Sequence, residues 1–182
     1  MEKFKNLKNY LLAFFIPFLL LVGMFYFKDV LNDIENIYVS DLRLQHIVFL
    51  NYLRNILVGD ASLTYSFSAG MGSPMLATII FYCLSPINIM LLLIKDIRYA
   101  ILFVYIIKVS LAGLTMFSLL KWKYDKNNFM TVLFSVCYAL GAFVINYFFC
   151  AFWFDVLYLA PIVVLSIEKM FKYKRINLLY IF

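Results

Sequence analysis

Charge is scarce in this 182-residue chain. Only 14% of the residues are Asp, Glu, Lys or Arg, whereas 65% are hydrophobic and 20% are aromatic. One small water-soluble core could not bury so much apolar surface, so the composition excludes an ordinary soluble domain. The sequence therefore predicts an integral membrane protein.

Residues suited to metal or redox chemistry are also few. Histidine occurs once, as His46, and the three cysteines, Cys83, Cys137 and Cys150, lie inside or at the edge of apolar runs without C-x-x-C spacing. Cysteines in such places are most simply small buried hydrophobes. A lone histidine near an apolar face is more often a hydrogen-bonded structural residue than a base or a ligand. No metal site is predicted.

The net charge of +6 raises the question of nucleic acid. The basic residues, however, come in short clusters that flank apolar runs, which is the pattern that sets membrane topology. No nucleic-acid partner is expected. The basic N-terminus is similar to a signal peptide, but the apolar run 10–27 is long enough to span and no small-x-small cleavage site follows, so it predicts a retained anchor.

Four further apolar runs, 74–94, 99–120, 129–150 and 156–171, could each cross a hydrocarbon core about 30 Å thick. The first is interrupted at "CLSPINI", where Pro86 removes a backbone donor and disfavours helical geometry at Ser85, so this run could also be two short helices that enter and return.

The positive-inside rule favours the second option. With a cytoplasmic N-terminus, re-entry of 74–94 leaves ten Lys and Arg residues inside and five outside, whereas full crossing gives five inside and ten outside. We expect an all-α multi-pass protein of the cell membrane. Its single transmembrane domain, 1–182, has about four spans, a long outer segment 28–98 and a re-entrant or broken apolar segment. The ending "RINLLYIF" resembles the start of another apolar run, which indicates the N-terminal part of a longer protein.

The outer segment contains an amphipathic stretch that predicts a helix lying in the membrane interface. From Leu42 onward, one face holds Phe49, Leu50, Leu53, Ile56 and Leu57, and the other holds Arg43, Asn51, Arg54 and Asn55. Asp41 and Gln45 project to the same side and could converge on one polar ligand. Arg43 and Arg54 could meet lipid phosphates. Asp41 could instead be a plain helix N-cap.

Three other features leave alternatives open. Lys108, inside an apolar run, could snorkel, pair within the bundle or offset a phosphate charge. Asp155 could be a solvated carboxylate at the end of a span or a second active-site acid. The glycines Gly70 and Gly72 predict a flexible turn rather than a phosphate cradle, because no P-loop pattern surrounds them.

Five elements in order resemble the start of the bacterial YfhO family of multispanning membrane proteins. They are the N-terminal anchor, "SDLRLQHIVFLNYLRNIL", "YSFSAGMGSPM", "FYCLSPINIMLLL" and "FWFDVLYLAPIVVLSIEKM". The resemblance implies a GT-C type glycosyltransferase that transfers a sugar from a polyprenyl-phosphate donor to teichoic acid or a related surface polymer on the outer face.

By position, the same resemblance makes Asp41 an active-site acid. From their own placement and charge, we expect Asp155 as a second acid and Gln45, Arg43, Arg54 and Lys108 as substrate-binding residues. The resemblance implies membrane lipids, a lipid-linked sugar and a polymer acceptor as partners, together with a polyprenyl-phosphate glycosyltransferase and a flippase. Two alternatives remain: a small non-enzymatic four-span protein, such as a GtrA-type polyprenyl-sugar flippase or an assembly partner, and an inactive truncated fragment.

Overall fold

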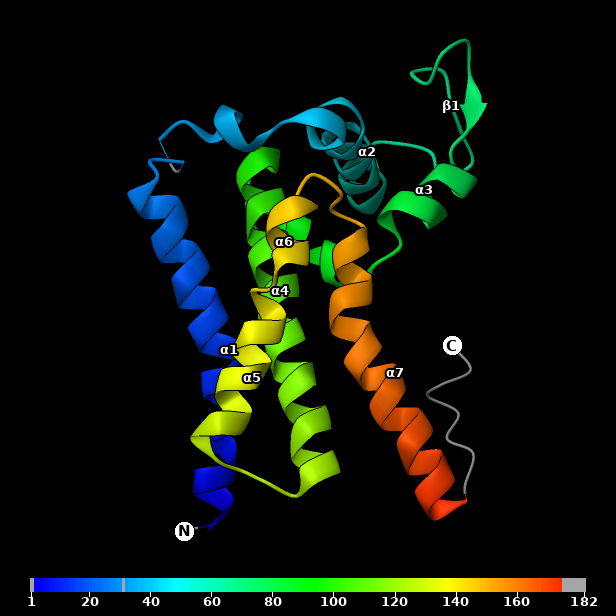
Figure 1. Cartoon of the computed structure of the whole chain (residues 1–182). Coiled ribbons are helices and arrows are strands. Elements are labelled where there is room, and N and C mark those ends of the chain that lie inside the picture. Colours follow the sequence, from blue (N-terminus) through cyan, green and yellow to red (C-terminus); the bar gives the residue numbers. More distant parts are fainter. Residues whose placement is uncertain (1, 31, 175–182) are drawn as a thin grey trace. The chain divides into compact units, whose positions relative to one another are not determined.

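The computed structural model describes residues 2–30 and 32–174, and most of these residues are helical (Figure 1). The strands in this described part are the two-residue β1 (Tyr65–Ser66) and β2 (Ser73–Pro74), which pair antiparallel. The prediction of an all-α protein is therefore confirmed. The run predicted to begin at 175–182 lies outside the described residues.

The chain forms two compact units. Unit 1 contains Met1–Met24, Ile106–Asn146 and Trp153–Phe182, and unit 2 contains Phe25–Tyr105 and Tyr147–Phe152. Each unit holds residues from distant parts of the sequence.

Within residues 2–30 and 32–174, three helical stretches are long and apolar enough to cross a membrane, namely Leu7–Phe27, Ile97–Tyr124 and Phe129–Asn146. They correspond to α1 (Glu2–Phe27), α4 (Ile97–Tyr124) and the pair α5 (Phe129–Ala139) and α6 (Ala142–Asn146). A short break after Ala139 separates α5 from α6. Three of the predicted spans are confirmed as apolar helices.

The fourth predicted span, 156–171, lies within a single helix, α7 (Trp153–Tyr173). It is not among the three apolar stretches found in the described chain. The reason is its charge, since Glu168, Lys169 and Lys172 fall in its last turns and Asp155 in its first. That α7 crosses the membrane stays a prediction.

Close backbone contact holds α1 against α4 in unit 1. A Cβ placed on Gly113 would lie 2.4 Å from the carbonyl oxygen of Ala13, so glycine is required for this approach. Around it, a core of Ala13, Phe117, Val132 and Val136 joins α1, α4 and α5. At the end of this core, Asn9 Nδ2 donates to Asn127 Oδ1 over 2.8 Å.

The segment predicted to be broken is broken in unit 2. Helix α3 (Leu76–Cys83) ends before Ser85, which is extended (φ −136°, ψ 130°), and Pro86 begins the 3₁₀ helix η3 (Pro86–Leu92). Eight residues of α-helix fall well short of the ~20 that a span requires. The turn is held by Asn88, whose Nδ2 donates to the carbonyl of Cys83 over 2.9 Å.

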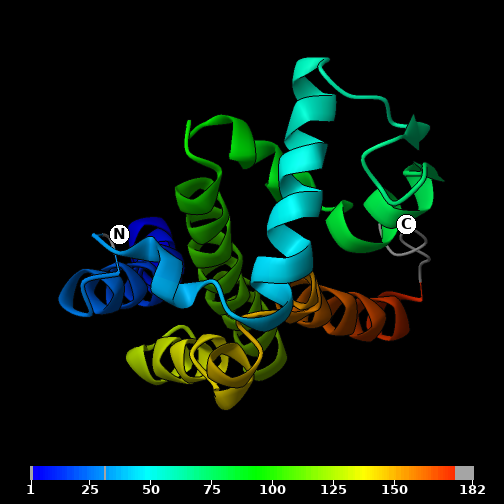
Figure 2. The same cartoon turned by 90° about the horizontal axis from the view of Figure 1, so that it is seen from above.

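The amphipathic helix predicted from Leu42 is divided in two. Leu42–His46 forms a π-helical turn, η2, and the α-helix α2 (Ile47–Val58) follows. Figure 2 shows α2 beside α3 and η3, against which it packs. Leu50 is buried there, whereas Leu57 is 43% exposed. Part of the apolar face predicted to meet lipid is therefore covered by the chain itself.

Candidate functional site

Asp41 lies at the entry to the π-helical turn. The preceding Ser40 has a positive φ of 50°, which turns the chain into the helix, and Asp41 itself is helical (φ −63°, ψ −27°). Its side chain makes no capping hydrogen bond and is half-buried. An N-cap side chain needs extended backbone to reach back to the free N–H groups, and helical geometry prevents this. The alternative that Asp41 is a side-chain cap is therefore wrong.

The π turn places His46 in an aromatic cluster. His46 is 2% exposed, and its ring centroid lies 5.8 Å from that of Tyr82 and 5.1 Å from that of Phe152. Phe49 packs on Tyr82 from the next turn, at 5.0 Å. His46 is thus a packed side chain, as the sequence indicated. Single π turns are often found at functional sites, and this one joins Asp41 to the cluster.

The loop 147–152 also approaches Asp41. Burial raises the pKa of the Cys150 thiol, and the negative charge of Asp41 raises it further. The thiol therefore stays protonated at neutral pH, where it is a weak hydrogen-bond donor and a poor nucleophile. Cys83 and Cys150 are buried as predicted, but Cys137 is exposed on α5, so the prediction for this cysteine is wrong.

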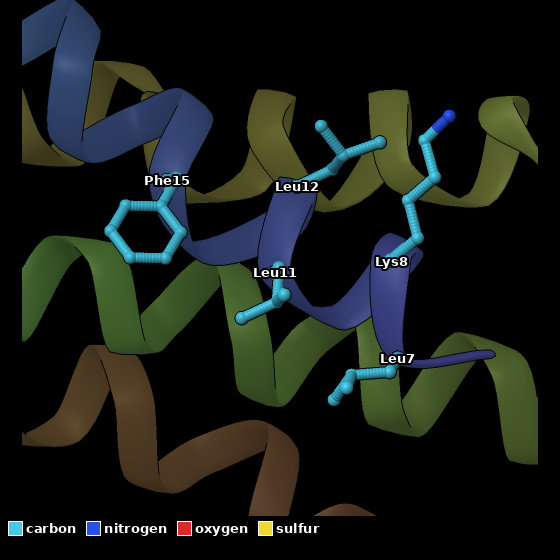
Figure 3. A pocket seen from close by; sticks show the side chains of 5 residues that line it. All are labelled: Leu7, Lys8, Leu11, Leu12 and Phe15. Atoms are coloured by element: carbon cyan, nitrogen blue, oxygen red, sulfur yellow. The ribbon is translucent and has the colours of Figure 1, made fainter. Parts of the chain in front are cut away.

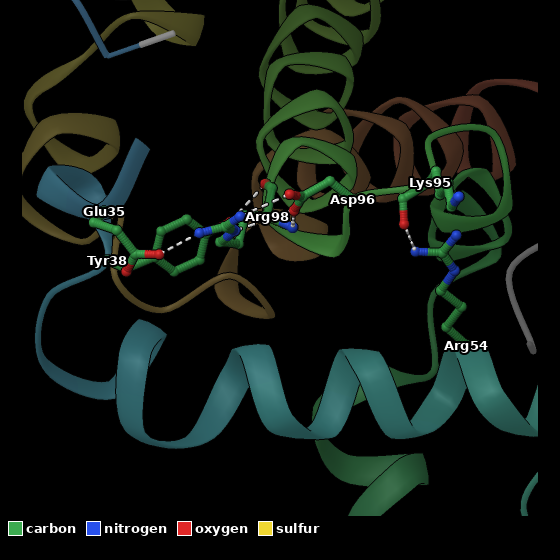
Figure 4. Close-up of polar contacts among 6 residues, drawn as sticks. All are labelled: Glu35, Tyr38, Arg54, Lys95, Asp96 and Arg98. Carbon is green, nitrogen blue, oxygen red and sulfur yellow. Dashed lines mark hydrogen bonds and ion pairs between the residues drawn. The ribbon is translucent and has the colours of Figure 1, made fainter. Parts of the chain in front are cut away.

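The other predicted residues of unit 2 have different surroundings. Arg43 and Gln45 are exposed on the π turn. Arg54 donates from Nη1 to the carbonyl of Lys95 over 2.7 Å, which ties α2 to the segment before α4 (Figure 4). One of the five donors of this guanidinium is used in that bond. Its predicted contact with a lipid phosphate stays a prediction.

A charged network that the sequence did not indicate surrounds Arg98 (Figure 4). Arg98 Nη2 lies 2.8 Å from Asp96 Oδ2, and Arg98 also pairs with Glu35. The hydrogen bond from Arg98 holds the pKa of Asp96 below its usual range. Tyr38, whose pKa is raised by burial, donates to the Arg98 carbonyl over 2.6 Å. The spacing of residues along the sequence could not predict this network, because Glu35 and Arg98 are 63 residues apart.

In unit 1, the structure brings together two predicted residues, Lys108 and Asp155. Lys108 Nζ lies 2.8 Å from Asp155 Oδ2, and the Lys108 side chain is only 3% exposed. Tyr158 donates to the other carboxylate oxygen, Oδ1, over 3.0 Å. Of the alternatives for Lys108, pairing within the bundle is the one observed. Asp41 belongs to unit 2, so the prediction that it shares a site with Asp155 stays a prediction.

A shallow groove of about 300 Å³ runs along α1 (Figure 3). It is lined by Leu7, Lys8, Leu11, Leu12 and Phe15. Its lining is apolar apart from one ammonium, so it suits a lipid acyl chain and offers no acid or base for catalysis. In the described part of the chain, no three His, Cys, Asp or Glu side chains gather in a group that could hold a metal ion.

The apolar helices and the buried intramembrane ion pair define an integral membrane protein. Residues 13–182 match the family model described as bacterial membrane protein YfhO. The chain belongs to the YfhO family. Comparison with curated proteins and with solved structures gave no significant match.

Proposed function

We propose that the chain is part of a membrane glycosyltransferase of the GT-C type. Its donor is a sugar on a polyprenyl phosphate, and its acceptor is a cell-surface polymer such as teichoic acid, on the outer face of the membrane. The proposal rests on membership of the YfhO family and on one structural observation, the state of the Asp41 carboxylate.

That carboxylate is half-buried at the start of a helix and does not cap it. An acidic side chain without a structural hydrogen bond at its own helix end keeps its lone pairs available for a ligand. The aromatic cluster of His46, Tyr82 and Phe152 packs at the other end of the π turn and fixes the backbone that carries Asp41. This supports a positioned base rather than a solvated surface acid.

The chemistry requires one base and one cation. Asp41 takes the proton from the acceptor hydroxyl, whose oxygen then bonds to the anomeric carbon of the sugar. The bond from that carbon to the phosphate oxygen breaks, and its electron pair leaves with the polyprenyl phosphate. Arg43, exposed two residues away, is the nearest cation in sequence that could stabilise the departing phosphate. Lys108 is already neutralised by Asp155.

The test is transfer of labelled sugar in cells that make the complete protein with Asp41→Asn. Loss of general-base help typically lowers the rate about 10²- to 10⁴-fold, while protein level should stay unchanged because the side chain makes no capping bond. The matched control is Asp60→Asn, which alters an exposed carboxylate of unit 2, just after α2. The Asp60→Asn variant should transfer labelled sugar at the normal rate.

Two results would contradict the proposal. Transfer by Asp41→Asn equal to that of Asp60→Asn would remove the catalytic role of Asp41. If instead the labelled polyprenyl sugar stays on the inner face when the whole protein is deleted, the protein moves the lipid across the membrane, as a GtrA-type flippase would.

A further inference from the structure

A short hairpin in unit 2 displays two large apolar side chains to its surroundings. The strands β1 and β2 pair Tyr65 with Pro74 and Ser66 with Ser73. Between them, Phe67 is 82% exposed and Met71 is 99% exposed. Two large apolar side chains exposed together on one tip form an apolar patch, and such patches mark interaction sites.

The tip has a defined conformation. Gly72 has a φ of +108°, and a Cβ on it would lie 2.2 Å from the Tyr65 hydroxyl, so the turn closes directly over this ring. At the base, Met75 donates its N–H to the carbonyl of Thr64 over 3.1 Å. Tyr52 of α2 donates to the carbonyl of Ser62 over 2.6 Å. The hairpin is therefore closed over the Tyr65 ring, and one hydrogen bond ties the segment before it to α2.

The absence of charge indicates what covers this tip. Residues 61–94, which include the hairpin, α3 and η3, contain no Asp, Glu, Lys, Arg or His. Charge returns at the two ends, with Asp60 before the segment and Lys95 after it. A protein partner usually meets an apolar patch with a polar, charged rim, whereas lipid hydrocarbon excludes charge.

The apolar surface also continues beyond the hairpin within unit 2. On α3, Ile80 is 50% exposed and Phe81 66%, and Leu84, just after it, is 74% exposed. The serines beside the tip carry hydroxyls, and Ser66 accepts from the N–H of Ser68 over 3.1 Å. Such a mixture of apolar tip and hydroxyl-bearing base matches the boundary between headgroups and acyl chains.

We propose that Phe67 and Met71 insert into the acyl-chain edge of the lipid bilayer and anchor the hairpin there. The insertion would be shallow, about 5–10 Å, because the turn has backbone groups that need water or headgroups as partners. This anchoring does not depend on sugar transfer, and the protein would keep it with any substrate.

The test is tryptophan fluorescence of the 182-residue chain in phosphatidylcholine vesicles. The native Trp122 and Trp153 are replaced by Phe, and one tryptophan is introduced by Met71→Trp or, separately, Phe67→Trp. Both sites are so exposed that the larger ring should not disturb folding. The control is Asn51→Trp, an exposed position on the polar face of α2.

Vesicles whose acyl chains carry bromine should quench the tryptophans at 67 and 71 more strongly than the tryptophan at 51. Dissolved iodide should quench the tryptophan at 51 more strongly than the tryptophans at 67 and 71. Iodide quenching at 67 and 71 equal to that at 51 would show a tip in water and would overturn the proposal. Protection from both quenchers would show a tip covered by protein, which would overturn it as well.

Discussion

Lys108 and Asp155 form an ion pair that joins α4 to α7, with Nζ 2.8 Å from Oδ2. The lysine side chain is almost fully buried, and Asp155 also accepts a hydrogen bond from Tyr158. A charge at this depth is stable only when it is compensated. The pair explains how an apolar bundle can contain a lysine, and it fixes the first turn of α7 against α4.

Removing one partner of this pair should destabilise the bundle. Asp155→Leu leaves the Lys108 ammonium buried without compensation, which typically costs about 3–5 kcal/mol. The double variant with Lys108→Met should recover most of that loss, because both charges are then absent. Unfolding in detergent measures the four proteins of this double-mutant cycle. A double variant no more stable than Asp155→Leu would show that the pair is not the cause.

The close contact of α1 with α4 makes a second prediction. Gly113→Ala should lower the free energy of unfolding by about 1–3 kcal/mol, because its Cβ meets the rigid backbone of Ala13. The matched control is Gly23→Ala in α1, where nothing lies within 4 Å. There the substitution should be neutral or stabilising by up to about 1 kcal/mol, since alanine favours helix. Equal effects at the two sites would contradict this packing.

The third prediction concerns the pH dependence of Cys150. Its thiolate is disfavoured by burial and by Asp41, so its reaction with iodoacetamide should rise only above the ordinary thiol pKa of about 8.5. Asp41→Asn removes the negative charge and should move the midpoint to lower pH. The measurement uses protein with Cys83→Ala and Cys137→Ala, and Asp60→Asn is the control. An unchanged midpoint in Asp41→Asn would show that Asp41 does not act on this thiol.

The fourth prediction concerns topology. Reporter domains fused after Lys123 or Lys174 should lie in the cytoplasm, and fusions at Ile34 or Phe154 should lie outside, because basic residues are retained inside. The fusion at Phe154 is decisive for α7. A cytoplasmic reporter there would contradict the four-span arrangement and would place Asp155 away from the outer compartment.

Local signals in the sequence predicted local structure well. The apolar runs predicted three long apolar helices. Pro86 predicted the break, since proline constrains the backbone at its own position and the one before. The π turn was not predicted, because a wider helical turn leaves no mark in composition. Cys137 was assigned to the interior because an apolar residue that faces lipid and one that faces the core are alike in sequence.

The candidate site was predicted less completely than the fold. Asp41, Lys108 and Asp155 were named from the sequence, but the ion pair joins residues 47 positions apart. The network of Glu35, Asp96 and Arg98 was missed for the same reason. Such pairings depend on how helices pack, which the spacing of residues along one helix does not determine.

The hydrogen bond between Asn9 and Asn127 has a consequence for synthesis of the protein. The two residues are 118 positions apart. At about 5–20 residues per second, α1 waits about 6–24 s before this partner emerges from the ribosome. During that interval the helix must be tolerated by lipid alone. Its exposed apolar side chains Leu11, Phe15 and Leu19 are suited to contact with lipid. The side-chain amide of Asn9 lies near the end of the span, where water can serve as a temporary hydrogen-bond partner.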